Sequence, residues 1–128
     1  MDKKIFYYFK ICAKLARKGE ERHFLLGSVG IRNDGAIVKS FNMPSEKPNR
    51  VCHAEYRICK KLDMFAPEIY VARIRLDDNN FGMSAPCENC RKVIASKKVQ
   101  RVYYTINSSK YGVWHVEKDI HVIKNMGL

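Results

Sequence analysis

Two short motifs constrain the fold of this chain more than any other feature of its sequence. The first is His53-Ala54-Glu55 and the second is Pro86-Cys87-Glu88-Asn89-Cys90. One imidazole and two thiolates can bind zinc, and three protein ligands leave the fourth tetrahedral position open for water, as in catalytic zinc sites. The sequence therefore predicts one zinc ion (Zn2+) per chain, bound by His53, Cys87 and Cys90, and a fold that brings both motifs together.

Glu55 is not needed as a metal ligand. A carboxylate two residues from the histidine ligand can exchange protons with a metal-bound water, which is the work of a general acid and base. Two other interpretations remain open. A redox Cys-x-x-Cys pair would leave His53 and Glu55 without a role, whereas a structural zinc site completed by Cys52 or His23 would leave only Glu55 unexplained.

The order H-x-E followed by P-C-x-x-C is a signature of zinc-dependent nucleobase deaminases. On these two motifs the chain resembles the cytidine deaminase superfamily, over roughly residues 3–105. The resemblance implies hydrolytic conversion of cytosine to uracil in a (deoxy)cytidine nucleoside or nucleotide, with release of ammonia and with Glu55 as the proton shuttle. A nucleic-acid-binding module with a structural zinc is the non-enzymatic alternative, but it would have no use for Glu55.

The resemblance also implies four substrate-binding residues. Asn42 resembles an Asn that binds the sugar in several branches, and capping of a turn is its other interpretation. Backbone groups near Ala54 and Ala85 would read the edge of the base. Tyr111 follows the last predicted strand of the motif region, where family members border the substrate pocket. Trp114 has two interpretations: its ring could stack on a base, or it could anchor the tail on the core. The burial typical of Trp favours the second interpretation.

Departures from the family patterns bear on the substrate. Nucleoside deaminases with three cysteine ligands usually have Cys-Ala-Glu and Asn-x-Glu, whereas this chain has His53 and Asn42-Met43-Pro44. Deoxycytidylate deaminases share His-Ala-Glu but usually have glycines near the position of Asn42. The Asn-x-Pro sequence resembles the tRNA adenosine deaminases. A polynucleotide deaminase, acting on cytosine in single-stranded DNA or RNA or on adenosine in RNA, is therefore the alternative function.

The chain has a net charge of +11, and the excess of Lys and Arg comes from its two ends. Residues 1–22 contain seven basic and three acidic residues, residues 91–128 contain eight and two, and the segment between them contains nine and eight. A basic surface attracts polyanions, so single-stranded nucleic acid is a candidate partner beside the small-molecule nucleotide. A protein that is merely basic and soluble is the simpler interpretation, and the sequence leaves open whether the chain forms a homo-oligomer.

Length and composition predict a single deaminase domain over residues 1–128. The apolar run Ile5–Phe9 stops at Lys10, which is too short for a membrane span of about 20 residues or for a signal-peptide core. Five cysteines, two of them assigned to zinc, argue against a disulfide framework and fit a reducing compartment. We therefore expect a cytoplasmic protein without a membrane partner.

The periodicity of apolar residues predicts an α/β fold. Apolar residues at three- and four-residue steps indicate an amphipathic helix over residues 3–18 with Cys12 in the core, and Asn33-Asp34-Gly35 indicates a hairpin between strands 24–31 and 36–41. The other expected elements are a loop over 42–51, a helix from Cys52 or His53 to Met64, a strand over 69–76, a helix opening at Pro86-Cys87, a strand over 99–105, a loop over 108–112 and a short strand over 113–116. A mixed sheet covered on both faces follows, and the resemblance implies the superfamily's three-layer α/β/α sandwich with about five strands.

Overall fold

The computed structural model describes residues 3–17, 25–32, 34–41, 43–44, 51–52, 68–75, 78, 80–86, 88–96 and 99–126. The helices and strands in these ranges are α1 (Lys3–Ala16), β1 (Leu25–Ile31), β2 (Ile37–Phe41), β3 (Met43–Pro44), β4 (Val51–Cys52), β5 (Glu68–Ile74), β6 (Phe81–Gly82), α3 (Glu88–Ser96), β7 (Arg101–Thr105), β8 (Lys110–His115) and β9 (Ile120–Asn125). Neither helix is long and apolar enough to span a membrane.

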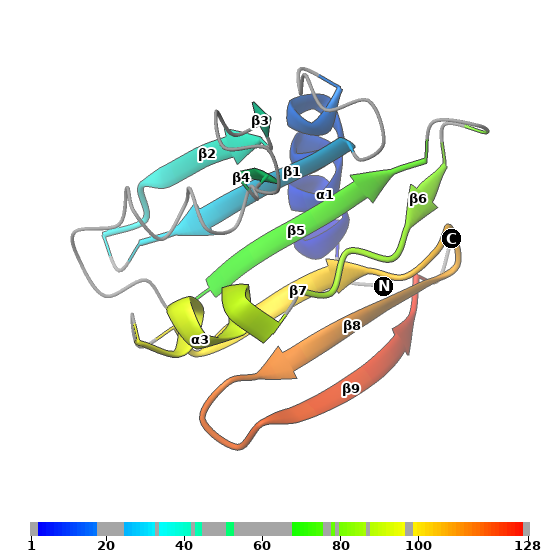
Figure 1. Cartoon of the computed structure of the whole chain (residues 1–128). Helices are drawn as coiled ribbons and strands as arrows, with labels where there is room; N and C mark the ends of the chain where they lie inside the picture. Colours follow the sequence, from blue (N-terminus) through cyan, green and yellow to red (C-terminus); the bar gives the residue numbers. More distant parts are fainter. Residues whose placement is uncertain are drawn as a thin grey trace.

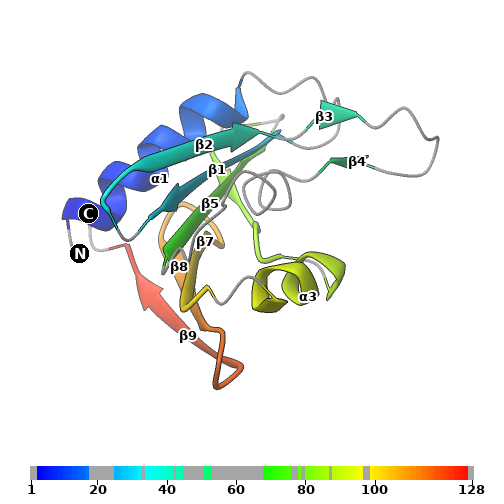
Figure 2. The same ribbon diagram turned by 90° about the vertical axis from the view of Figure 1, so that its left-hand side faces the viewer.

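The main sheet is mixed, as predicted. Its strand order is β2-β1-β5-β7-β8-β9, and β6 pairs with β5 off this path (Figure 1). Only β5 and β7 run parallel, and every other neighbouring pair in this sheet is antiparallel. The expected number of about five strands was too low, because the described residues form a seven-stranded sheet. Helix α1 lies on one face of the sheet and α3 on the other (Figure 2).

Helix α1 confirms the amphipathic helix predicted from apolar spacing. The side chains that it buries recur at three- and four-residue steps: Phe9, Cys12, Ala13, Leu15 and Ala16. The helix lies close to β1 at Gly27, where a Cβ atom would be 1.9 Å from the carbonyl oxygen of Cys12. Glycine is required here because any side chain would push the helix off the sheet.

The β1–β2 hairpin is also confirmed. Gly35 has φ +86°, a conformation that glycine adopts at little cost. The carboxylate of Asp34 accepts a hydrogen bond from the backbone N–H of Ala36, 3.0 Å away. An Asp side chain that bonds its own turn in this way is a common device of tight turns.

Four residues that follow β2 belong to two short strands that were not expected. Met43 pairs with Cys52 and Pro44 with Val51, so the two-residue strands β3 and β4 form a separate antiparallel pair. The prediction of an irregular loop was wrong at these positions, because local composition does not reveal a two-residue pairing. Cys52 belongs to β4, and the remainder of the helix expected up to Met64 lies outside the described residues.

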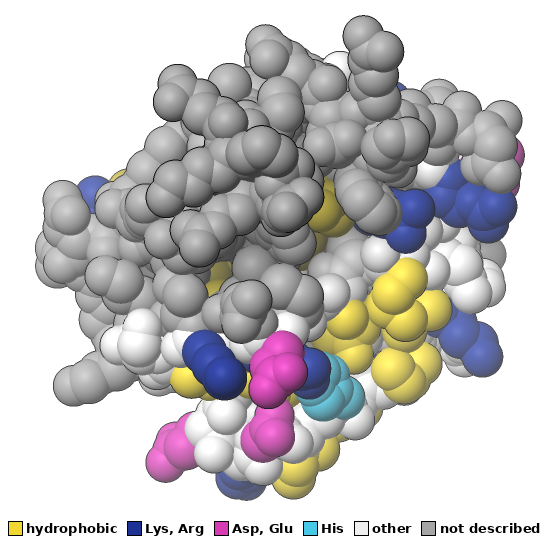
Figure 3. Space-filling model, viewed as in Figure 1, with side chains coloured by type: hydrophobic (Ala, Val, Ile, Leu, Met, Phe, Trp, Pro, Cys, Tyr) yellow, Lys and Arg dark blue, Asp and Glu magenta, His cyan; other side chains and the backbone are white. Residues whose placement is uncertain are grey.

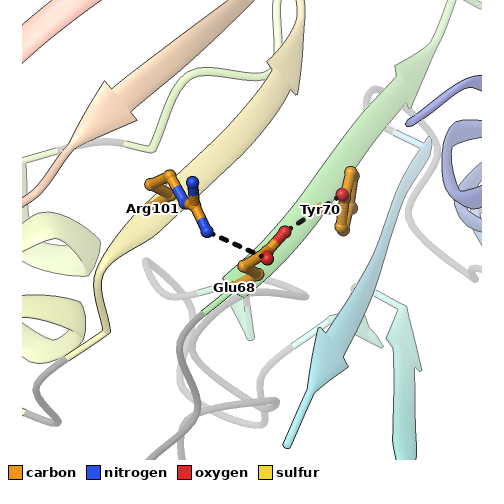
Figure 4. A network of polar contacts seen from close by, with 3 residues as sticks. All are labelled: Glu68, Tyr70 and Arg101. Atoms are coloured by element: carbon orange, nitrogen blue, oxygen red, sulfur yellow. Dashed lines mark hydrogen bonds and ion pairs between the residues drawn. The ribbon is translucent and has the colours of Figure 1, made fainter. Parts of the chain in front are cut away.

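The parallel pair β5–β7 is tied together at its first residues. Glu68 is the register partner of Arg101, and a guanidinium nitrogen of Arg101 lies 3.1 Å from a carboxylate oxygen of Glu68. The hydroxyl of Tyr70 donates a hydrogen bond to the other oxygen of Glu68, at 3.2 Å (Figure 4). This network fixes the register with which the two strands begin.

The C-terminal tail forms a hairpin that completes the sheet. The short strand expected over 113–116 is β8, which begins earlier, so the prediction of a loop was wrong for residues 110–112. Strand β9 was not predicted, because its sequence, Ile-His-Val-Ile-Lys-Asn, does not alternate strictly between apolar and polar residues. All six of its residues are exposed. Trp114 is 3% exposed, and its indole N–H donates to a carboxylate oxygen of Asp119, 2.9 Å away. The anchoring interpretation of Trp114 thus agrees with the structure.

Two hydrophobic clusters fill the two sides of the sheet. The α1-face cluster joins α1 to the sheet and contains the buried residues Phe9, Cys12, Leu15, Val29, Tyr70, Ala72, Tyr103, Tyr111, Val113 and Met126. The α3-face cluster contains the buried residues Ile69, Val71, Ile94, Val99, Val102, Tyr104 and Trp114. Residues of β5 and β7 alternate between the two clusters, as expected for strands covered on both faces.

Candidate metal centre

Most of the predicted site residues lie outside the part of the chain that the structure describes. These are Asn42, His53, Ala54, Glu55 and Cys87. Cys90 lies in the first turn of α3, which begins at Glu88. Ala85 is exposed and Pro86 is buried in the segment between β6 and α3. The described residues therefore show the helix and strands that flank the predicted site.

Strands β3 and β4 pair residues that are sequence neighbours of two predicted site residues. Met43, which directly follows Asn42 in the sequence, is the register partner of Cys52, which directly precedes His53. The backbone pairing of these two residues thus joins the segment that carries the predicted sugar ligand to the segment that carries the predicted metal ligand. Sequence spacing alone did not indicate this pairing.

A buried hydroxyl pair lies just before the cysteine motif. Ser84 is 3% exposed and Thr105 is fully buried. The Ser84 hydroxyl accepts a hydrogen bond from the backbone N–H of Thr105 at 2.8 Å, and the two hydroxyl oxygens are 2.9 Å apart. Ser84 Oγ is also 3.0 Å from the carbonyl oxygen of Val71, and the Thr105 hydroxyl donates to the carbonyl oxygen of Gly82 at 2.8 Å. Neither residue was singled out from the sequence.

This hydroxyl pair lies where β5 stops pairing with β7 and begins to pair with β6. The first residues of β5 pair with β7, whereas Arg73 and Ile74 pair with β6. The backbone N–H of Arg73 donates to the Thr105 hydroxyl at 3.2 Å, so the pair bonds to all three strands. The junction lies at the carboxyl ends of the parallel strands, which is where open α/β sheets place their ligands. It fixes the chain three residues before Cys87.

The start of α3 favours thiolates. Pro86 and Cys87 directly precede Glu88, the first residue of the helix. Proline fits the beginning of a helix, and the unpaired N–H groups of the first turn lower the pKa of a nearby thiol. The start of α3 at Glu88 agrees with the prediction that the motif opens a helix, since Cys90 lies in the first turn.

Polar side chains also lie on the sheet next to α3. The Tyr104 hydroxyl is 2.9 Å from Nδ1 of His121, and the ring of Trp114 stacks on the His121 ring at 5.9 Å. Burial raises the pKa of the Tyr104 hydroxyl, and the charge of Arg91 on α3 acts in the opposite direction. The α3 face also carries a patch of exposed hydrophobic side chains next to Lys and Arg side chains (Figure 3).

The position of Tyr111 does not fit the substrate-binding role that the resemblance implied. Its side chain is 4% exposed and packs edge-on against Phe9 of α1, with ring centroids 5.8 Å apart. It belongs to the α1-face cluster, on the side of the sheet opposite α3. The sequence could not reveal this, because the loop expected around Tyr111 is part of β8.

Ser28 is a further polar residue that the sequence did not single out. It is fully buried in β1, and its hydroxyl has no hydrogen-bond partner within the described ranges. Ser28 is the register partner of Val71, which belongs to the α3-face cluster. Its hydroxyl therefore lies on the same side of the sheet as α3.

The donor set of the two motifs fits a zinc ion. Histidine nitrogen and cysteine sulfur are the ligands that zinc prefers in proteins. The described residues themselves contain no cluster of three or more His, Cys, Asp or Glu that could bind a metal. Zinc would therefore be bound by His53, Cys87 and Cys90, whose arrangement the described residues do not test.

Several solved structures of deaminases share the fold of this chain. The chain superimposes on cytidine deaminase from Burkholderia pseudomallei with a TM-score of 0.63 at 14% identity, covering 95% of this chain and 92% of that one. For cytidine deaminase from Mycobacterium leprae the TM-score is 0.65 at 13% identity, with coverage of 98% and 95%. The dCMP deaminase from cyanophage S-TIM5, in complex with dCMP and dUMP, has a TM-score of 0.57 at 21% identity, with coverage of 81% and 82%. At these identities the similarity establishes the fold, which is cytidine deaminase-like.

Comparison of sequences gives the family. No curated protein sequence matches the chain significantly. Residues 2–106 match the family described as the cytidine and deoxycytidylate deaminase zinc-binding region. The match includes the His-Ala-Glu and Pro-Cys-x-x-Cys motifs and extends over most of the chain. The chain therefore belongs to the cytidine and deoxycytidylate deaminase family.

Proposed function

We propose that this protein is a zinc-dependent hydrolytic deaminase that converts cytosine to uracil in a (deoxy)cytidine nucleoside or nucleotide. The observation that carries the proposal is the family match over residues 2–106, a range that contains His53, Glu55, Cys87 and Cys90 of the two sequence motifs. A structural zinc site does not require Glu55, whereas a deaminase needs a group that moves protons.

The proposed mechanism assigns one role to each motif residue. Bound zinc would lower the pKa of a coordinated water and make a nucleophile available at neutral pH. Glu55 takes a proton from the attacking water and passes protons to the ring nitrogen and to the leaving amine. The carbon that bore the amine gains the water oxygen, so cytosine and water become uracil and ammonia.

The substrate-binding residues of the proposal come from the resemblance. Asn42 binds the sugar, and backbone groups near Ala54 and Ala85 bind the edge of the base. The exposure of Ala85, directly before Pro86, supports its place in the proposal. Tyr111 is left out because it is buried beneath α1.

A nucleotide substrate has independent support. The phage dCMP deaminase with the same fold was solved in complex with dCMP and dUMP, and it shares 21% of its residues with this chain. The His-Ala-Glu sequence of this chain is the one usual among deoxycytidylate deaminases. We therefore place the deoxynucleotide first among the substrates to be assayed, and a cytoplasmic location remains part of the proposal.

Replacing Glu55 tests the proposal. Turnover of dCMP and of cytidine is measured as uracil formation for the parent protein and for Glu55→Gln, and zinc content is measured in both. We expect Glu55→Gln to keep its zinc and to lose about 10²- to 10⁴-fold in turnover. Equal activity of the two proteins would remove Glu55 from the mechanism. A zinc-containing parent inactive on cytidine, dCMP, single-stranded DNA and RNA would favour a structural zinc site.

A further inference from the structure

The outer face of α1 combines positive charge with exposed aromatic surface. Lys3, Tyr7, Lys10 and Lys14 follow one another at four- and three-residue steps, which places them in one line along the helix. All four are exposed. Together with the half-buried Phe6 and Ile11 they line a groove of about 480 Å³, here called the α1 groove.

Charge in the α1 groove is of one sign. Residues Lys3–Ala16 contain no Asp or Glu, and the first turn of α1 carries Lys instead of the acidic residues that suit a helix N-terminus. Lys3 therefore opposes the helix dipole, and helix stability does not account for it. Lys10 lies over the ring of Phe6, 4.7 Å from its centre, which holds this ammonium group beside an aromatic surface. The groove is complementary to a polyanion.

Tyr7 is the exposed end of a row of four tyrosines whose rings contact one another in sequence. Its ring, 52% exposed, lies parallel to that of Tyr8 within 3°, with centroids 5.5 Å apart. Tyr8 contacts Tyr70 at 4.8 Å, and Tyr70 stacks on Tyr103 at 4.5 Å. Since Tyr70 and Tyr103 are buried in the sheet, the row fixes the orientation of the Tyr7 ring. A ring held in this way loses little conformational freedom when another planar group stacks on it.

We propose that the α1 groove binds single-stranded nucleic acid, with Lys3, Lys10 and Lys14 contacting phosphates and Tyr7 stacking on a base. Proteins that bind single strands without sequence preference combine a positively charged groove with aromatic side chains on which bases stack. Lys3 and Lys14 are eleven residues apart, or about 16 Å along the helix, which is long enough for several nucleotides.

A membrane surface fits these observations less well. Amphipathic helices that lie on membranes bury their apolar face in the lipid. In α1 that face is already occupied, because Phe9, Cys12 and Ala16 are buried against the sheet. The face that remains for a partner is the basic one, which also carries Tyr7 and the half-buried Phe6 and Ile11.

The inference does not depend on the proposed reaction. Helix α1, whose side chains line the α1 groove, lies on the opposite face of the sheet from α3 (Figure 2). The metal centre is proposed at the first turn of α3. A strand bound to α1 would therefore contact a surface separate from the proposed active site. Deamination of a mononucleotide should be unchanged by substitutions in the groove.

Binding of fluorescently labelled 20-nucleotide oligo-dT and oligo-U, measured by anisotropy over a range of salt concentrations, tests the proposal. The groove variant is the triple substitution Lys3→Gln, Lys10→Gln and Lys14→Gln. The matched control is Lys92→Gln, Lys110→Gln and Lys118→Gln, which removes three exposed lysines elsewhere and changes the net charge equally. Melting temperatures confirm that both variants fold.

We expect the groove variant to bind at least about 10-fold more weakly than the control variant, with a salt slope smaller by about 2, since each contact to a single strand contributes about 0.7. Tyr7→Ala should weaken binding about 10-fold, within the range for loss of one stacked base, and Tyr7→Phe should bind like the parent. Three results would overturn the proposal: equal loss in the control variant, full binding by Tyr7→Ala, or binding to phosphatidylserine vesicles but not to either oligonucleotide.

Discussion

Ser84 and Thr105 hydrogen-bond to each other at the point where the neighbour of β5 changes from β7 to β6. Their hydroxyl oxygens are 2.9 Å apart, and the Ser84 hydroxyl accepts the backbone N–H of Thr105. A β-sheet leaves unpaired backbone groups wherever one strand ends beside another, and buried groups of this kind must find partners. The two hydroxyls provide hydrogen-bond partners for such backbone groups. Ser84 lies three residues before Cys87, the first cysteine of the motif.

Removing either hydroxyl should destabilise the fold. We expect Ser84→Ala and Thr105→Val each to lower the free energy of unfolding by about 1–3 kcal/mol, because the buried partners are left unsatisfied. Urea denaturation measures this change. Thr105→Ser keeps the hydroxyl and should lose less than Thr105→Val, whereas Ser108→Ala, at an exposed position, should be neutral. Parent-like stability of both Ser84→Ala and Thr105→Val would show that water replaces the pair.

Gly27 should not tolerate a side chain. In Gly27→Ala the new Cβ would meet the carbonyl oxygen of Cys12 at 1.9 Å and the backbone nitrogen of Ala16 at 2.7 Å. Because both are backbone atoms, α1 must shift as a whole, and we expect a loss of about 2 kcal/mol or more in the free energy of unfolding. The control is Gly82→Ala, where the nearest atom belongs to the side chain of Arg75. An equal effect at both positions would contradict the tight contact between α1 and β1.

Stability should decline at alkaline pH. Burial raises the pKa of the Cys12 thiol above its ordinary value of 9.0, and burial followed by the charge of Glu68 raises the pKa of the Tyr70 hydroxyl above 10.0. The folded protein therefore keeps these protons at a pH where the unfolded chain releases them. This contribution is fully present below pH 9 and is lost as the pH rises.

Urea midpoints measured between pH 7 and pH 10 test this dependence. We expect the parent midpoint to fall above pH 9 and the fall between pH 9 and 10 to be shallower in Cys12→Ala, because that variant lacks the buried thiol. The slopes of the urea midpoint against pH are compared, because Cys12→Ala also loses packing at every pH. Parallel curves for the two proteins would show that Cys12 does not contribute.

Metal content should follow the proposed ligands. We expect one zinc per chain in the purified protein and none in the double variant Cys87→Ala and Cys90→Ala. Cys12→Ala is the matched control, because this cysteine is buried in the α1-face cluster and should not affect zinc. Elemental analysis after dialysis measures both. Full zinc retention in the double variant would contradict the ligand assignment. Zinc loss in the control variant would indicate general unfolding.

Local patterns were enough for some of these features. The apolar spacing of α1 and the Asp34-Gly35 turn predicted their elements because helix periodicity and positive φ are properties of a few neighbouring residues. The two motifs predicted the family for a similar reason, since zinc binding demands particular donor atoms and each motif is confined to a few neighbouring residues. These inferences needed no knowledge of which segments lie side by side.

Other features depended on tertiary structure because they arise between segments distant in sequence. The roles of Ser84 and Thr105 exist only where β5, β6 and β7 meet, and Met43 and Cys52 are joined only by strand pairing. Tyr111 and Trp114 lie three residues apart on β8, yet they belong to clusters on opposite faces of the sheet. Successive strand residues alternate between faces, so strand register and the helix covering each face decided which aromatic ring packs under α1 and which lies beside α3.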